Sequence, residues 1–160
     1  MDILDKAMKK EKDEESFYRG LSLECKMEEL RIIFNLLAND EVKHYEILKN
    51  IKKSNRFNFY ETDILTQVKK IFSELKRKDF IFEPDTTLIE VYSKAQDKEM
   101  QNENFYSQEA GKIKEKELKA IFMELAEDER RHYFLLENII EFVSGPQGWM
   151  MSNEFENLDR

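Results

Sequence analysis

The sequence is poor in the residues that cross-link or interrupt a chain: among 160 residues it has one cysteine, two prolines and four glycines. The lone Cys25 excludes a disulfide within the chain and any metal knuckle built on paired cysteines. Scarce proline and glycine, beside many Glu, Lys, Leu and Ile residues, predict long helices. We therefore expect an all-α protein whose length suits one buried core.

Basic clusters and long apolar runs are also missing. The net charge is −8, which disfavours nucleic acid as a partner because phosphate carries the same sign. No run approaches the ~20 apolar residues of a membrane span, and the first residues are acidic where a signal peptide needs basic ones. The sequence therefore predicts a soluble, cytoplasmic protein with neither nucleic acid nor membrane as partner.

What the sequence does contain is an internal duplication. Residues 88 positions apart match without a gap, as His44 and His132 do. So many matches at one offset indicate a duplicated unit, and the offset is too long for a solenoid repeat. The matching pairs include Ala7 and Ala95, Glu11 and Glu99, Phe17-Tyr18 and Phe105-Tyr106, Leu37-Ala38 and Leu125-Ala126, Asp40-Glu41 and Asp128-Glu129, and His44-Tyr45 and His132-Tyr133.

Each copy has the apolar periodicity of two helices with a short turn between them, which makes the two helices antiparallel. Two such hairpins predict a four-helix bundle with pseudo-twofold symmetry, because the long connection between them can cross the length of a bundle. We expect one domain over residues 1–144 and a C-terminal tail over 145–160. Within the domain we expect hairpins over 3–52 and 87–143 and a crossover over 54–85 with its own helix at 61–78.

The apolar seam on the second helix of each hairpin is interrupted by polar side chains. In the first copy, Glu41 and His44 take two places in a series of Leu, Ile and Phe residues spaced by four and three. The second copy repeats this series, and the first helix of each hairpin places one glutamate at seven-residue steps with a tyrosine. Six side chains are therefore expected to point into the bundle: Glu11, Glu41, His44, Glu99, Glu129 and His132.

Burying these six groups together is costly unless cations join them, because a bare carboxylate loses its hydration. Glu and His three residues apart share one helical face, so each Glu-x-x-His offers an oxygen and a nitrogen ligand. One Glu from each of two helices plus Glu-x-x-His from each of the others is a di-iron or di-manganese pattern. We predict two metal ions, iron first, with Mn or Zn as substitutes. The alternative is an exposed pair or a hydrogen-bonded core histidine, which the double occurrence disfavours.

Further repeated residues flank this set. Glu15 and Glu103 lie one turn beyond the proposed ligands and form either a salt-bridged flank, which we favour, or ligands in their place. Tyr18 and Tyr106 either pack in the core, the simpler reading, or donate a hydrogen bond to the site.

Crossed hydrogen bonds are expected to hold the histidines. A metal-bound histidine needs its other ring nitrogen held by a carboxylate or carbonyl, and Asp40 and Asp128 each precede a ligand glutamate. In the predicted bundle the second helices of the hairpins face each other, so we expect Asp128 to accept from His44 and Asp40 from His132. The alternative is that both aspartates face solvent beside the basic residues three positions further on.

Four strings resemble the rubrerythrin branch of the ferritin-like superfamily. They are Glu11-x6-Tyr18, Leu37-Ala38-x-x-Glu41-x-x-His44, Glu99-x6-Tyr106 and Leu125-Ala126-x-x-Glu129-x-x-His132. The resemblance covers residues 7–143, and residues 149–158 resemble the tail of stand-alone members. It implies a ferritin-like fold and a di-iron site.

The resemblance also implies roles for the six ligands. Glu41 and Glu129 would bridge the irons, while Glu11 and Glu99 would each hold one iron from the side. Members of the family typically reduce hydrogen peroxide to water with electrons from iron, in defence against oxidative stress.

Two departures from the family pattern matter. Full-length rubrerythrins carry a rubredoxin-like domain with paired cysteines, which this sequence lacks, so electrons must come from another, rubredoxin-like protein. They also carry an extra glutamate three residues after the third helix's ligand, where this chain has Asn102. The pseudo-symmetric position is Glu14, so the seventh ligand has either moved to Glu14 or is missing.

The sequence leaves three functions open. The first is an oxidoreductase that reduces peroxide or dioxygen; the second is iron handling, as a ferroxidase or a storage or delivery protein. The third is a helical interaction module that a metal only fastens. Aromatic residues in or beside the crossover predict a homodimer, or else cover the side of the bundle: Phe57, Phe59, Phe72, Phe80 and Phe82.

Overall fold

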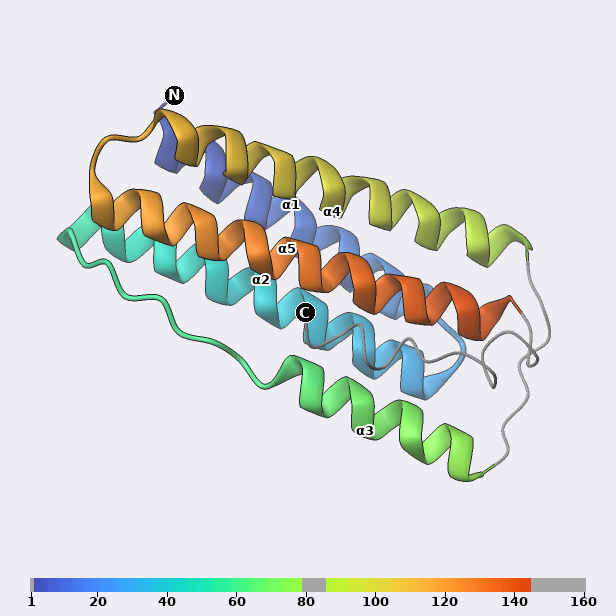
Figure 1. Ribbon diagram of the computed structural model, residues 1–160. Coiled ribbons are helices and arrows are strands. Elements are labelled where there is room, and N and C mark those ends of the chain that lie inside the picture. Colours follow the sequence, from blue (N-terminus) through green and yellow to red (C-terminus); the bar gives the residue numbers. More distant parts are fainter. Residues whose placement is uncertain (1, 79–85, 145–160) are drawn as a thin grey trace. The chain divides into compact units, whose positions relative to one another are not determined.

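The computed structural model describes residues 2–78 and 86–144, and these ranges contain five helices and no strand (Figure 1). The all-α fold class is therefore confirmed. The chain divides into two compact units, residues 1–64 and residues 65–160. The expected tail, together with Phe80 and Phe82, lies outside the described residues. None of the helices in the described ranges has the length and apolar character needed to cross a membrane.

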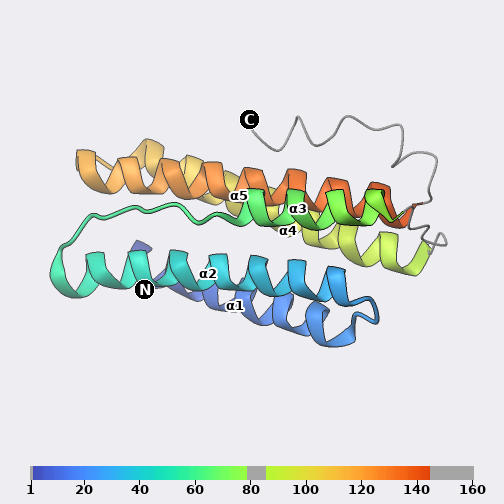
Figure 2. The ribbon, with the colours of Figure 1, turned by 90° about the horizontal axis from the view of Figure 1, so that it is seen from below.

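The first unit is a helical hairpin. Helix α1 (Ile3–Glu24) and helix α2 (Glu28–Ser54) lie side by side and run antiparallel (Figures 1 and 2). The Asp2 carboxylate starts α1 by accepting a hydrogen bond of 2.8 Å from the backbone N–H of Asp5. Helix α2 ends at Asn55, whose φ of 55° is left-handed, a conformation that asparagine tolerates better than most residues.

The second unit contains another hairpin and most of a shorter helix. Helix α4 (Thr86–Lys112) and helix α5 (Lys116–Val143) run antiparallel, and helix α3 (Ile64–Arg77) precedes them in the chain. Phe72 of α3 is fully buried and meets Phe142 of α5 edge-on, with ring centroids 5.9 Å apart. Phe72 therefore packs within this unit. This agrees with the alternative to a subunit contact, in which the aromatic residues of the crossover cover the side of the bundle.

The helix boundaries repeat the offset seen in the sequence. Helices α1 and α4 end at Glu24 and Lys112, and helices α2 and α5 begin at Glu28 and Lys116, in both cases 88 positions apart. The duplicated unit is therefore the hairpin together with its turn.

The crossover helix begins later than expected, at Ile64 rather than at Glu61. The residues between α2 and α3 are not helical, and the hydroxyl of Thr62 donates a hydrogen bond to the Asp40 side chain of α2. This contact ties the end of the connection to α2, two residues before α3 begins. Sequence periodicity cannot reveal it, because it is a side-chain contact between distant residues.

The apolar seam of each second helix is buried, as its spacing predicts. In α2 the seam residues are at most 5% exposed, and in α5 only Leu118, in the first turn, is half-exposed. Burying one such Leu, Ile or Phe side chain contributes about 1.5–3 kcal/mol. The seams thus hold rigid the stretches of α2 and α5 in which the Glu and His residues lie.

Candidate metal centre

The first hairpin brings three predicted ligands together. Glu11 comes from α1, whereas Glu41 and His44 share one face of α2 because they are three residues apart. His44 Nδ1 lies 3.3 Å from Glu11 Oε2 and 3.9 Å from Glu41 Oε1. One donor atom from each of the three lies within 4.8 Å of the others. We call these residues the first triad.

The second hairpin repeats the arrangement. Glu99 comes from α4, and Glu129 and His132 come from α5. His132 Nδ1 lies 3.5 Å from Glu99 Oε1, and the donor atoms of the three again lie within 4.8 Å of one another. These residues are the second triad. In both triads Nδ1 of the histidine approaches the carboxylate from the first helix of the hairpin. Nε2 is therefore the ring nitrogen that is left to form a hydrogen bond with a further group.

Burial and donor chemistry show that each triad suits a metal ion. All six side chains are at most 2% exposed, a setting in which neighbouring carboxylates repel each other and lose their hydration. Two carboxylates and an imidazole suit Fe, Mn or Zn. An ion about 2.1 Å from each donor needs donors no more than roughly 4.2 Å apart, a spacing that small side-chain rotations would reach. The residues present therefore fit the metal that the sequence predicts.

One buried carboxylate distinguishes the two hairpins. Glu14 lies one turn beyond Glu11 on α1 and is 6% exposed, and its counterpart on α4, Asn102, is also buried. Helix α1 thus offers a second buried acid near its triad, whereas α4 offers a neutral amide. Glu14 remains the further candidate ligand that the sequence suggested.

The repeated residues Glu15 and Glu103 differ in their surroundings. Glu15 forms ion pairs with Arg19 and Lys12 at 3.6 and 3.7 Å, so it is a salt-bridged flank. Burial raises the pKa of Glu103, and although the positive charge of Arg130 opposes this, the negative charge of Glu127 adds to it. Neither residue belongs to the triads.

The two aspartates next to the ligands are buried rather than solvent-facing. Asp40 accepts from Thr62 and lies 3.5 Å from Lys43 Nζ, and Asp128 accepts a hydrogen bond of 2.6 Å from Arg131. They therefore contact the basic residues that the alternative named, but without its exposure to solvent. The expected crossed bonds to the histidines join one unit to the other and remain a prediction.

The two repeated tyrosines pack as core residues. Tyr18 and Tyr106 are fully buried. Tyr18 stacks on Phe34 with ring centroids 6.4 Å apart, and Tyr106 meets Phe122 edge-on at 5.4 Å. These contacts support the packing interpretation.

Sequence reasoning missed two polar contacts near the site. One is the bond from Thr62 to Asp40, which falls in the connection and has no repeated counterpart. The other is Gln96, a buried α4 residue whose amide donates to Glu137 at 2.7 Å. Its counterpart on α1 is Met8, so a polar residue at an apolar repeat position was a usable signal.

Comparison with known proteins places this chain in a family. The family model described as rubrerythrin matches residues 2–140. The chain therefore belongs to the rubrerythrin family, a ferritin-like di-iron family. No curated protein and no solved structure matches the chain significantly.

Proposed function

We propose that this chain is a di-iron carboxylate oxidoreductase of the cytoplasm that reduces hydrogen peroxide, or dioxygen, with electrons from a separate donor protein. The observation that carries the proposal is the pair of buried Glu, Glu and His triads, one per hairpin, in a chain of a di-iron family. Each triad would supply the ligands of one iron, with Glu41 and Glu129 as the bridging carboxylates.

The bound metal would supply the redox chemistry, namely the two electrons that together with two protons would reduce one hydrogen peroxide to two waters. The chain would supply the ligands and the control of charge. Four carboxylates offset the charge of two divalent ions, and a nearby buried acid such as Glu14 would favour the ferric state. Burial of both triads keeps bulk water away from the reacting oxygen.

The electron donor is proposed to be a rubredoxin-like protein, since one cysteine cannot build a rubredoxin-like iron site in this chain. A homodimer remains a second proposal about partners. Phe57 and Phe59 of the connection are half-exposed and are available for a subunit contact. Light scattering that reports a particle of 19.3 kDa at micromolar concentration would contradict the dimer.

Iron handling is the competing function, and Asn102 is the observation that favours it. Family peroxidases place a glutamate where this chain has an amide, so this chain lacks one acid that follows the change in iron charge. In that case the chain would oxidise Fe(II) and hold or deliver the product without steady peroxide turnover. More than two irons per chain after aerobic loading would support this function.

Rapid mixing after anaerobic loading tests the proposal. The chain is loaded with two equivalents of Fe(II) and mixed in a stopped-flow instrument with hydrogen peroxide or with oxygen-saturated buffer. We expect one peroxide to oxidise both irons, and a reduced rubredoxin-like protein to restore them for repeated turnover. A zinc-loaded sample is the control, because zinc has no redox chemistry. Iron that stays ferrous in excess peroxide would refute the proposal.

A further inference from the structure

In the first hairpin, the space between Glu15 on α1 and Asn35 and Asn39 on α2, which we call the outer groove, is occupied by the side chain of Arg19. Arg19 extends from α1 across α2, where its Nη2 donates to Asn39 Oδ1 at 2.8 Å and its Nη1 to Asn35 Oδ1 at 3.3 Å. The Glu15 carboxylate lies 3.6 Å from Nη2. A carboxylate on one helix and two amide oxygens on the other thus form a cradle for one guanidinium group.

At the same place in the second hairpin the arginine is missing from the repeat. The residues 88 positions on from Arg19, Asn35 and Asn39 are Ser107, Met123 and Glu127, while Glu103 keeps the place of Glu15. A pocket of about 240 Å³ lies here between α4 and α5, and all four of these residues line it. The volume is several times the ~30 Å³ that one water molecule occupies in the liquid, so the pocket has room for a side chain.

The lining of the pocket favours a cation with an apolar stem. Glu103 and Glu127 contribute carboxylates from opposite sides, and Ala110, Ala126 and Met123 contribute apolar surface. Burial raises the pKa of Glu103, so a cation that enters would stabilise its ionised form. Lys119 also lines the pocket, and the charge of Arg130 lowers the pKa of Glu103, so an added cation competes with these two residues for the carboxylates.

We propose that this pocket binds the guanidinium group of an arginine supplied by another protein chain. Glu103 takes the ion pair that Glu15 makes with Arg19, and Glu127 takes the place of Asn39 with a stronger, charge-assisted bond. Met123 and the two alanines cover the methylene stem, as apolar surfaces do for arginine. A planar guanidinium matches two carboxylates better than the single ammonium of lysine does.

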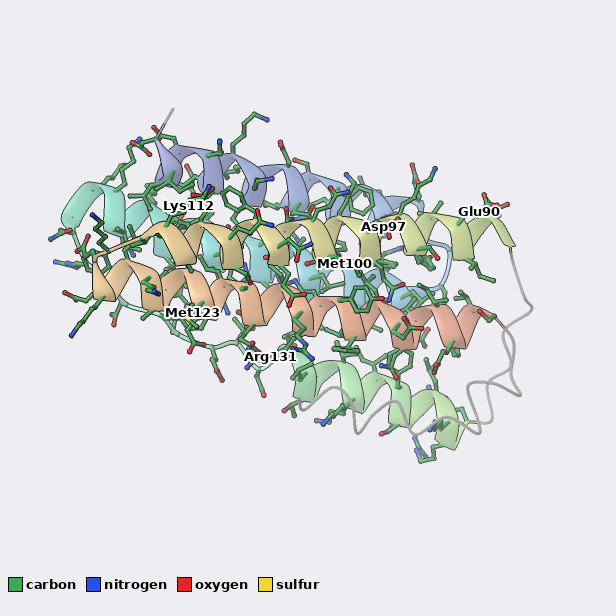
Figure 3. All side chains as sticks on the ribbon, turned by 45° about the horizontal axis from the view of Figure 1, so that its top comes forward. Glu90, Asp97, Met100, Lys112, Met123 and Arg131 are labelled. Carbon is green, nitrogen blue, oxygen red and sulfur yellow. The ribbon has the colours of Figure 1, made fainter. Side chains whose placement is uncertain are left out.

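The surface around the pocket supports a protein as the source of the arginine. Met100 on α4 and Met123 on α5 project from the two helices (Figure 3) and are 44% and 55% exposed. Met100 lies three residues before Glu103 and therefore on the same face of α4. Methionine and arginine are both enriched at protein interfaces, so this face offers contact area beyond the guanidinium itself.

A nuclear magnetic resonance titration of the full chain tests the proposal, with zinc added because it is diamagnetic. The probe is acetyl-Gly-Arg-Gly-amide, and the matched control peptide has lysine in place of arginine. We expect saturable shifts confined to residues of α4 and α5 around the pocket, with a dissociation constant on the order of 1 mM. The lysine peptide should bind at least about threefold more weakly. Equal binding of the two peptides would overturn the guanidinium assignment.

Substitutions then locate the binding. Glu103→Gln and Glu127→Gln should each weaken binding of the arginine peptide about tenfold, whereas Glu15→Gln, the matched change in the first hairpin, should leave it unchanged. Ser107→Arg should abolish binding, because its own side chain fills the pocket as Arg19 fills the first groove. Unchanged binding by the Ser107→Arg variant would refute the site. Butylguanidinium, a free alkylguanidinium with a single positive charge, is the last probe: if it binds as tightly as the peptide, the protein source is wrong.

Discussion

The two hairpins have the same set of candidate metal ligands but different surroundings. Glu11, Glu41 and His44 recur as the second triad, 88 positions on, with the same Nδ1 orientation and nearly the same distances. The outer groove is filled by Arg19 in one hairpin and is a pocket in the other. Glu14 of the first hairpin is an amide in the second. The two copies thus agree in the proposed metal ligands and differ at the positions to which we assign charge control and partner binding.

Residues that are the same at equivalent positions of the two hairpins should have the same role in each hairpin. A proposed metal ligand that is present in both hairpins should cause a similar loss of iron binding when it is removed from either hairpin. A residue found in one hairpin alone should give an effect that its counterpart does not. Matched pairs of variants, one in each hairpin, separate these cases.

The largest effect is expected from removing one glutamate of each triad. The Glu41→Ala/Glu129→Ala double variant should lose stoichiometric iron, because each ion loses a carboxylate and its charge compensation. Elemental analysis after anaerobic Fe(II) loading and desalting measures this, with wild type expected to retain two irons per chain.

The matched control changes two glutamates of the same repeat position away from the triads. Glu29→Ala/Glu117→Ala removes acids from the first turns of α2 and α5 and should retain both irons. Stoichiometric iron in the Glu41→Ala/Glu129→Ala protein would remove the basis of the proposed metal centre.

The next effect concerns the aspartates beside the ligands. Asp40→Asn and Asp128→Asn should each weaken iron binding by roughly ten- to a hundredfold, if each aspartate fixes the tautomer of a ligand histidine. Competition with a chelator under anaerobic conditions measures the affinity. Thr62→Val is the control, since it removes only the hydroxyl that donates to Asp40. Unchanged affinity in both aspartate variants, with the fold intact, would leave their role to the contacts with Lys43 and Arg131.

A smaller effect, on the rate of iron oxidation, should differ between the two hairpins. Glu14→Gln should keep two irons but slow their oxidation by peroxide about tenfold, because a buried carboxylate stabilises the higher iron charge. Asn102→Asp adds a carboxylate at the pseudo-symmetric place and should not slow the reaction. Stopped-flow absorbance measures both rates. Equal rates for wild type and Glu14→Gln would show that the seventh ligand is missing rather than moved.

Much of the fold and site could be predicted because both depend on repeating patterns. The spacing of Leu37, Glu41, His44 and Leu48 on one face of α2 follows from helical geometry alone, so the triads follow from the sequence once the helices are accepted. The pocket at Ser107 could not be predicted, because it arises from the length of a side chain that the repeat has lost. The contact of Thr62 with Asp40 likewise joins residues far apart in the chain, and no local pattern encodes it.

The smallest expected effect concerns stability, and it should have opposite signs in the two hairpins. Glu15→Gln removes ion pairs with Arg19 and Lys12 and should destabilise the fold by up to about 0.5 kcal/mol. Glu103→Gln should instead stabilise it by a similar amount, on the order of 0.3 kcal/mol.

Burial raises the pKa of Glu103, so the native state binds its proton more tightly than the unfolded chain, whose glutamates titrate near pH 4.3. The stability from this proton is fully present below that pH and is lost as the pH rises through the folded pKa, so ionised Glu103 is a cost at pH 7. The gain from Glu103→Gln should therefore shrink as the pH falls from 7 towards 5. Urea denaturation of both variants and wild type, in the same metal-loading state, measures the difference, and a loss of stability in Glu103→Gln equal to that in Glu15→Gln would show that the two grooves are alike.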